Sequence, residues 1–84
     1  MSAPSPLSVV IVDDDELVAQ SLRTILEARG NVRVAALGTK GAEAAALFNE
    51  HHPDIMLLDI RMPDLSGLAA GEAILAAHPK ARIV

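Results

Sequence analysis

Three aspartates are the residues of this sequence whose type and position could carry chemistry. Asp13 and Asp14 end the apolar run Val9–Val12, and Asp59 ends the run Ile55–Leu58. Each run is short and continuously apolar, which predicts a buried parallel strand. Ligands of open parallel sheets collect outside the carboxyl ends of the strands, so neighbouring strands would bring the three carboxylates into one crevice. Carboxylates that lie close together repel one another, and such a cluster favours a cation or a proton.

An amphipathic helix is expected after the first pair of aspartates. It spans residues 16–29, with Asp15 placed to cap its first turn and Gly30 placed to end it. Its apolar residues recur at helical spacing and are assigned to one buried face: Leu17, Val18, Leu22, Ile25 and Leu26. This helix would carry the chain back to the start of the next strand.

A second strand and a second helix follow. Residues 32–36 alternate like a strand with one partly solvated face, which predicts a place at the edge of the sheet. An alanine-rich helix then runs from Gly38 to about His51, and its buried side carries Leu47 and Phe48. The strand and helix together form a second crossover unit.

The remaining sequence repeats the alternation. Residues 54–59 form the third predicted strand, and the proline and glycine of residues 61–67 predict a loop. A third helix is expected over 68–78, and 82–84 begin a fourth strand. The third helix has three residues assigned inward: Leu68, Ile74 and Leu75. This βαβαβαβ order predicts right-handed crossovers and a parallel sheet with helices on both faces.

Composition limits the classes of function. The chain has 84 residues, enough for one small domain, and a net charge of −4 that argues against a nucleic-acid surface. It has no cysteine, which suits a reducing cytoplasm, and its apolar runs are too short to span a membrane. Residues 1–7 contain two prolines and no basic residue, so we expect a short disordered leader rather than a signal peptide.

The end of the sequence falls inside an apolar pattern. Ile83 and Val84 are the last residues of the predicted fourth strand. This predicts a fragment of a larger fold, with the domain occupying residues 8–84. Because an uncovered strand edge invites pairing, we also expect self-association or exchange of elements between copies.

The aspartates and their neighbours resemble the receiver domain of two-component response regulators. The matching features are the acid pair after Val9–Val12, the Leu57-Leu58-Asp59 segment, the Met62-Pro63-Asp64 segment and Gly67, four residues after Pro63. The resemblance implies a flavodoxin-like, doubly wound parallel sheet with strand order 2-1-3-4-5, of which residues 8–84 are the N-terminal two thirds. Its first and third strands are neighbours, which would place Asp14 beside Asp59.

The resemblance also implies a chemistry. Asp59 would accept a phosphoryl group from a phosphohistidine of a sensor histidine kinase, with Mg²⁺ neutralising the phosphoryl oxygens. It assigns Asp14 as a direct metal ligand, Asp13 as a ligand through water, and the backbone carbonyl of Arg61 as a further ligand. Pro63 and Gly67 would shape the loop. The expected role is that of a signalling domain rather than an enzyme.

Two residues of the family pattern have no counterpart here. Receivers carry a switch Ser or Thr after the fourth strand and a Lys after the fifth, and this sequence ends before both. Regulators of this kind often continue into a DNA-binding output domain. We expect any contact with DNA to be made by such a domain and not by the residues of this sequence.

Two alternatives remain open at this stage. One is a receiver remnant that binds partners without accepting phosphate. The other is a haloacid-dehalogenase-type phosphohydrolase, because Asp13-x-Asp15 after a strand imitates its nucleophile and acid. That motif expects Thr or Val where this chain has Leu17, and it leaves the Met62-Pro63 segment unexplained.

Overall fold

The protein contains a three-stranded parallel sheet at its centre. The structure, a computed structural model, describes residues 6–59 and 66–84. Hydrogen bonding places the strands in the order β2-β1-β3, so β2 is an edge strand, as predicted. The strands are β1 (Leu7–Val12), β2 (Val32–Gly38) and β3 (Ile55–Leu58). The first and third strands are therefore neighbours, which is the arrangement the aspartates require.

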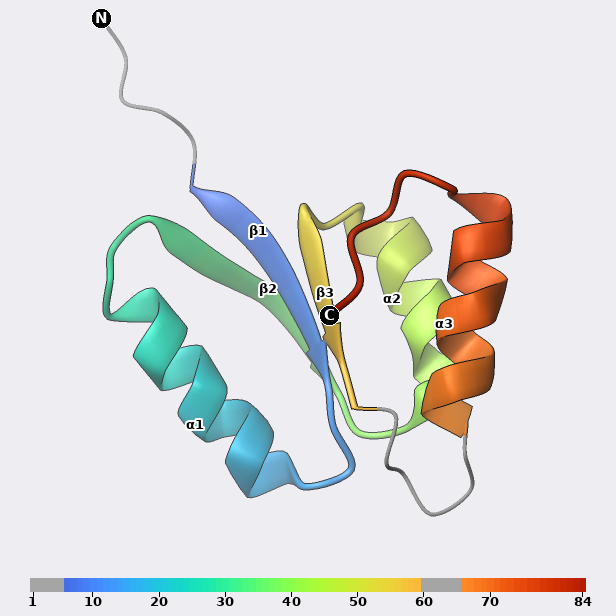
Figure 1. The fold of residues 1–84 in the computed structure, drawn as a ribbon. Helices are drawn as coiled ribbons and strands as arrows, with labels where there is room; N and C mark the ends of the chain where they lie inside the picture. The colour runs from blue at the N-terminus through green and yellow to red at the C-terminus, as the bar shows by residue number, and fades with distance from the viewer. Residues whose placement is uncertain (1–5, 60–65) are drawn as a thin grey trace, which may run out of the picture.

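The helices cover both faces of this sheet. Figure 1 shows α1 on one face and the pair α2 and α3 on the other. Their bounds are α1 (Glu16–Glu27), α2 (Ala44–His51, after a 3₁₀ turn at Gly41–Glu43) and α3 (Ser66–Ala77). The flavodoxin-like architecture is confirmed in its layers and in the order of its first three strands. In the part of the chain that the structure describes, no helix is both long and apolar enough to cross a bilayer.

The chain after α3 returns alongside β3. Ile83 forms a parallel bridge with Met56, and the amide of Met56 donates to the carbonyl oxygen of Arg82 at 2.9 Å. The amide of Leu58 donates to the carbonyl oxygen of Val84, also at 2.9 Å. These bonds confirm the predicted start of a fourth strand on the outer side of β3. Association of copies through this edge stays a prediction.

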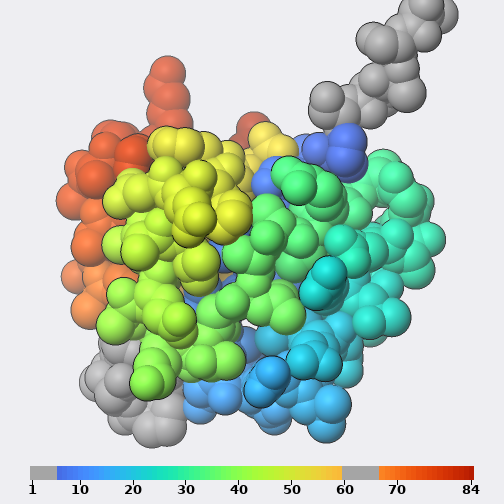
Figure 2. Space-filling view, turned by 180° about the vertical axis from the view of Figure 1, so that it is seen from behind, coloured from blue at the N-terminus to red at the C-terminus, as the bar shows by residue number. Residues whose placement is uncertain are grey.

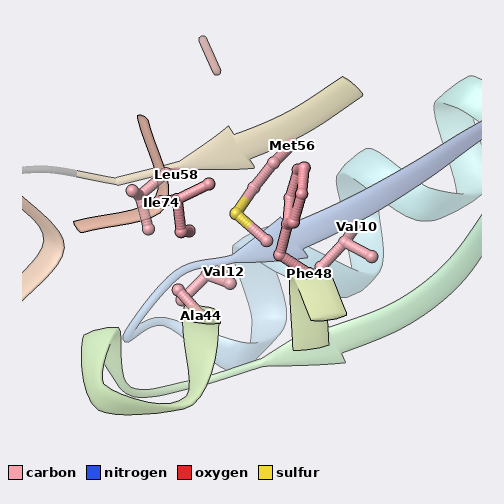
Figure 3. Close-up of a cluster of buried hydrophobic side chains, with 7 residues drawn as sticks. All are labelled: Val10, Val12, Ala44, Phe48, Met56, Leu58 and Ile74. Carbon is pink, nitrogen blue, oxygen red and sulfur yellow. The ribbon is translucent and has the colours of Figure 1, made fainter. Parts of the chain in front are cut away.

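The larger hydrophobic core lies between the sheet and the pair α2 and α3. Figure 3 shows Met56 and Phe48 within this cluster. Its buried members alternate along β1 and β3 and meet residues of the two helices: Val10, Val12, Ala44, Phe48, Met56, Leu58 and Ile74. The nearly complete absence of aromatic residues gives a core built from aliphatic side chains around a single phenylalanine ring.

A smaller core lies under α1, and it corrects the predicted helix face. Ala19 is buried there, and Leu22 and Leu26 pack beside it. The predicted inward residues Leu17, Val18 and Ile25 are instead 74%, 43% and 60% exposed. At 100° per residue, the face centred on Ala19 and Leu26 leaves Leu17 on the opposite side of the helix. The prediction of one apolar face was therefore wrong for these three.

The inward face of α3 also differs from the prediction. Ile74 is buried at 2% exposure, but Leu68 and Leu75 are 50% and 43% exposed. Gly71 lies on the same side as Ile74, and a Cβ atom there would approach Leu58 Cδ2 at 3.3 Å. The contact face of α3 is thus made of small residues and one isoleucine, because the helix packs close to the sheet.

The N-terminal end of α1 follows the predicted chemistry, whereas the C-cap is Ala28 and not Gly30. Asp15 has an extended backbone, and its carboxylate accepts from the amides of Leu17 at 3.0 Å and Val18 at 3.3 Å. Gly30 adopts a left-handed φ of 82° just after the helix, a conformation that favours glycine. Asp15 is therefore a helix cap, and α1 ends two residues earlier than expected.

Strand β2 contains a bulge that the alternation did not predict. Val9 pairs with Val34, but Val10 pairs with Ala36, so Ala35 is an extra residue. Ala35 and Ala36 both pack on the core under α2, whereas Leu37 packs on the core under α1. Without the bulge, strict alternation would turn Ala36 and Leu37 to the opposite faces.

Glu27 at the end of α1 binds strand β2 through its carboxylate. Glu27 Oε2 accepts from the amide of Val34 at 3.1 Å, and Oε1 accepts from Arg23 Nε at 3.3 Å. The Val34 amide, followed by the hydrogen bond and charge of Arg23 and the charge of Arg33, lowers the pKa of Glu27, although partial desolvation opposes the shift.

We expect this contact to make stability depend on pH in a defined direction. A carboxylate with a lowered folded-state pKa stabilises the fold above its unfolded pKa, and that contribution disappears as pH falls through the folded value. Urea unfolding at pH 7 should therefore show Glu27→Gln less stable than the parent, with the difference narrowing at pH 3. Glu72→Gln, on α3, is the matched control. An equal difference in unfolding free energy between Glu27→Gln and the parent at pH 7 and at pH 3 would contradict this role of the Glu27 carboxylate.

Candidate functional site

The backbone fixes two of the three aspartates at the carboxyl edge of the sheet. Asp13 directly follows β1, and its amide donates to the carbonyl oxygen of Gly38 at the end of β2, at 3.0 Å. Asp59 directly follows β3, and its amide donates to the carbonyl oxygen of Val12 at 2.9 Å. Each hydrogen bond extends the pairing of neighbouring strands by one residue. The backbone of Asp13 and that of Asp59 are therefore each held in position by an adjacent strand.

The three carboxylates converge as their sequence positions predict. Asp13, Asp14 and Asp59 each offer a carboxylate oxygen, and these oxygens all lie within 4.8 Å of one another. Asp13 and Asp59 are half-buried, and Asp14 is exposed. Of the predicted loop residues, Arg61 and Pro63 lie outside the described residues, whereas Gly67 is buried in the first turn of α3.

The segment between β1 and α1 orients Asp13 and separates it from Asp15. Asp13 Oδ1 accepts from the amide of Asp15 at 2.8 Å, which holds one carboxylate oxygen against the backbone. Asp15 Oδ1 in turn accepts from the first amides of α1. One oxygen of Asp15 is therefore engaged in capping the helix, and Asp15 is not among the carboxylates that converge with Asp59.

The chemistry of the donor set fits Mg²⁺. This ion prefers hard oxygen ligands in an octahedron with metal–oxygen distances of about 2.1 Å, so oxygens on opposite sides of it are about 4.2 Å apart. The three aspartate oxygens all lie within 4.8 Å of one another, close enough to surround one ion, and a water molecule can link a more distant carboxylate to it. A divalent cation would also relieve the repulsion among three neighbouring carboxylates.

The sequence did not reveal an apolar hollow beside these aspartates. It has a volume of about 260 Å³, and Asp13 and Asp59 line it together with Leu22, Leu57 and Val84. Its signal in the sequence is weak, because these apolar residues come from α1, β3 and the last residue of the chain. The hollow gives the acidic cluster an apolar wall on the side of α1.

Comparison with known proteins assigns this architecture to a family. The model of the family described as the response regulator receiver domain matches residues 9–84. The polar-differentiation response regulator DivK of Brucella ovis is 44% identical over 61 residues, which cover 73% of this chain and 48% of that protein.

Solved structures agree with this assignment. A LuxR-family two-component response regulator from Aurantimonas sp. SI85-9A1 superposes with a TM-score of 0.86 at 32% identity, covering 94% of this chain and 56% of that one. The CheX–CheY–BeF₃–Mg²⁺ complex from Borrelia burgdorferi gives a TM-score of 0.82 at 28% identity, covering 94% of this chain and 60% of that one.

The chain is shorter than the proteins it matches. It spans between a fifth and a half of the length of the first curated relatives, with 20%, 23% and 48% covered. The match nevertheless includes both strands that carry the aspartates and the helices around them. By its family match and its fold, this chain belongs to the response regulator receiver domains of two-component signalling.

Proposed function

We propose that this chain is a phosphoacceptor receiver in which Asp59 takes a phosphoryl group from a phosphohistidine of a sensor histidine kinase. The observation that carries the proposal is the convergence of Asp13, Asp14 and Asp59 at the carboxyl edge of the sheet. Membership of the receiver family supports the choice of reaction. A cytoplasmic location belongs to the same proposal.

The transfer is a displacement at phosphorus. A carboxylate oxygen of Asp59 attacks the phosphorus atom, the bond from phosphorus to the imidazole nitrogen breaks, and that nitrogen keeps the electron pair. The product is an aspartyl phosphate. Because a carboxylate is a weak nucleophile, the protein must position it in line with the bond that breaks at phosphorus. The hydrogen bond from the amide of Asp59 to the carbonyl oxygen of Val12 serves this purpose by holding the backbone of Asp59.

The neighbouring aspartates would hold the metal. Asp14 and Asp59 would bind Mg²⁺, Asp13 would contribute through a water molecule, and the backbone carbonyl of Arg61 would be a further ligand. When bound, Mg²⁺ would neutralise negative charge on the phosphoryl oxygens. The hydrogen bond from Asp15 to Asp13 Oδ1 keeps the second oxygen of Asp13 in a defined direction.

We expect Mg²⁺ to raise the melting temperature of the parent and to lose this effect in Asp14→Ala. At a Mg²⁺ concentration tenfold above its Kd the stabilisation is about 1.4 kcal/mol, which corresponds to roughly 5–10 °C for a domain of this size. Without metal, Asp14→Ala should melt higher than the parent because one repelling carboxylate is gone.

Asp15→Asn is the control for this metal test, because it removes one charge beside the site and keeps a residue that caps helices well. Differential scanning calorimetry with and without Mg²⁺ measures all three proteins. Equal Mg²⁺ shifts in the parent and in Asp14→Ala would remove Asp14 from the ligand set.

The test of the function itself is incubation with Mg²⁺ and a small-molecule phosphodonor, followed by intact-mass measurement. One added phosphoryl group supports the proposed acceptor, and omission of Mg²⁺ with a chelator should reduce it strongly. Absence of any adduct, in a chain that circular dichroism shows to be folded, would instead favour the non-catalytic interaction module.

We also propose that the receiver controls a DNA-binding output domain outside this sequence. The chain itself carries a net charge of −4, so its own surface is unsuited to a phosphate backbone. DNA binding should therefore be absent from this chain, and a filter-binding assay at low salt would reveal any exception.

A further inference from the structure

A second hollow lies at the opposite end of the sheet from the aspartates. It has a volume of about 450 Å³, within the range of small-molecule sites. Three segments meet there: the start of β1, the turn from α2 into β3, and the residues after α3, which Figure 1 and Figure 2 show gathered at one end of the molecule. The site proposed above does not involve any of these residues.

Three aromatic rings form a corner in this hollow. The rings of Phe48 and His78 have their centroids 4.8 Å apart and are tilted by 41°. The ring of His52 stands almost perpendicular to that of His78, at 86°, with 6.3 Å between centroids. Such a corner offers a planar ligand one ring to stack on and another to meet edge to face.

The fold holds the ring of His78 and the backbone of His52 in place. His78 Nε2 donates to Asn49 Oδ1 of α2 at 3.1 Å. This hydrogen bond fixes the ring from one edge, and Nδ1 lies on the other edge. His52 ends α2 in a left-handed conformation with φ of 44°, and its amide donates to the carbonyl oxygen of Phe48 at 2.8 Å. A ligand would therefore meet a His78 ring whose orientation is fixed by a hydrogen bond and a His52 ring carried on a fixed backbone.

The side chains that line this hollow carry more positive than negative charge, whereas the whole chain has a net negative charge. Lys80 and Arg82 line the hollow, with Asp54 as the acidic lining residue. Asp54 Oδ2 accepts from the amide of Ser8 at 2.7 Å, so this carboxylate is directed to the backbone of β1. Two cations against one engaged carboxylate favour an anion, in a chain whose net charge is −4.

We propose that this hollow binds a planar aromatic ring that carries an anionic group, the chemical class of a nucleoside monophosphate. The ring stacks against His52 and His78, which contact the buried ring of Phe48, and the anionic group meets Lys80 and Arg82. Bases stack on histidine and phenylalanine in proteins, and phosphate pairs with arginine and lysine. The proposal does not depend on phosphorylation of Asp59.

The test is a titration of the ¹⁵N-labelled chain with adenosine 5′-monophosphate in the presence of EDTA, followed by amide chemical shifts. We expect the amides of His52, Asp54, Ala81 and Arg82 to shift and saturate. Adenosine alone and inorganic phosphate alone should each bind at least about tenfold more weakly, because each lacks half of the contacts. The chelator keeps the acidic end from contributing through a metal.

Two variants separate the parts of the site. The double variant Lys80→Glu, Arg82→Glu should weaken binding of the monophosphate at least about tenfold, whereas Lys40→Glu, at the other end of the sheet, should leave it unchanged. His52→Asn removes a ring and keeps a residue that tolerates the left-handed backbone, so it should weaken adenosine and the monophosphate alike. Shifts that map to Asp59, equal affinity for phosphate alone, or equal affinity in all variants would each overturn the proposal.

Discussion

Asp59→Asn should take up no phosphoryl group under conditions in which the parent takes up one. The change keeps the shape and the backbone amide that donates to the carbonyl oxygen of Val12, so the sheet edge should stay intact. It removes the nucleophilic oxygen pair, since an amide is a far poorer nucleophile than a carboxylate. Intact-mass measurement after incubation with Mg²⁺ and a phosphodonor gives the answer directly.

Asp15→Asn provides the matched comparison for this experiment. Asp15 lies two residues after Asp13, and its carboxylate caps α1 by accepting from the amides of Leu17 and Val18. Asparagine caps helices about as well, so this variant should still be phosphorylated. An adduct that persists in Asp59→Asn would place the acceptor elsewhere, and loss of the adduct in Asp15→Asn would revive the phosphohydrolase alternative.

Ile74→Ala should destabilise the fold severely, whereas its neighbour Leu75→Ala should have little effect. Ile74 is 2% exposed and packs in the core between α3 and the sheet, and Leu75 is 43% exposed. Truncation of a buried isoleucine costs about 2–5 kcal/mol, a large part of the roughly 4–13 kcal/mol expected for a domain of 84 residues. Alanine at the exposed position changes stability by roughly 0.5 kcal/mol or less.

Chemical unfolding of both variants and the parent measures this contrast. The comparison is sharp because the two residues are adjacent on one helix and similar in size, so helix propensity and overall hydrophobicity change similarly. Similar losses in Ile74→Ala and Leu75→Ala would mean that α3 packs with the face the hydrophobic pattern first suggested. The orientation of α3 described above would then be wrong.

The arrangement of the aspartates was predictable because it depends on few features. Two apolar runs that end in acids predict two parallel strands whose carboxyl ends lie at the same edge of the sheet. The expectation that these two strands are neighbours came from the family resemblance, and their pairing confirms it. Asp13 and Asp59 then converge whatever the details of side-chain packing. The metal and phosphoacceptor roles of these residues rest on the family resemblance, and Arg61 and Pro63 lie outside the described residues.

The packing of the helices was less predictable for a physical reason. An apolar pattern shows which residues could be buried, but small residues decide how close a helix comes to the sheet. Ala19 in α1 and Gly71 in α3 occupy the contact faces, and this displaces Leu17 and Leu75 to the surface. Such close approach depends on the partner strand, which periodicity within one helix cannot describe.

The second hollow, at the end of the sheet opposite the aspartates, could have been anticipated from the positions of two histidines in the sequence. His52-Pro53 and His78-Pro79 each follow the end of a helix. In a right-handed parallel fold, successive crossover helices end at the same side of the sheet, where the next strand begins. Two histidines 26 positions apart in the sequence are therefore expected near each other.

The bulge at Ala35 has a consequence for insertions and deletions in this chain. The side chains before the bulge and those after it alternate between the two faces of the sheet, but in opposite phase. Deletion of Ala35 would remove the extra residue, so that Val34, Ala36 and Leu37 alternate regularly and keep their partners Val9, Val10 and Ile11. Insertion of one residue after Ala36 would instead place Leu37 opposite Val12, where Gly38 now lies and an added Cβ would be 2.8 Å from Leu47 Cδ1. Strand β2 should therefore tolerate the loss of a residue at the bulge better than the gain of a residue after it.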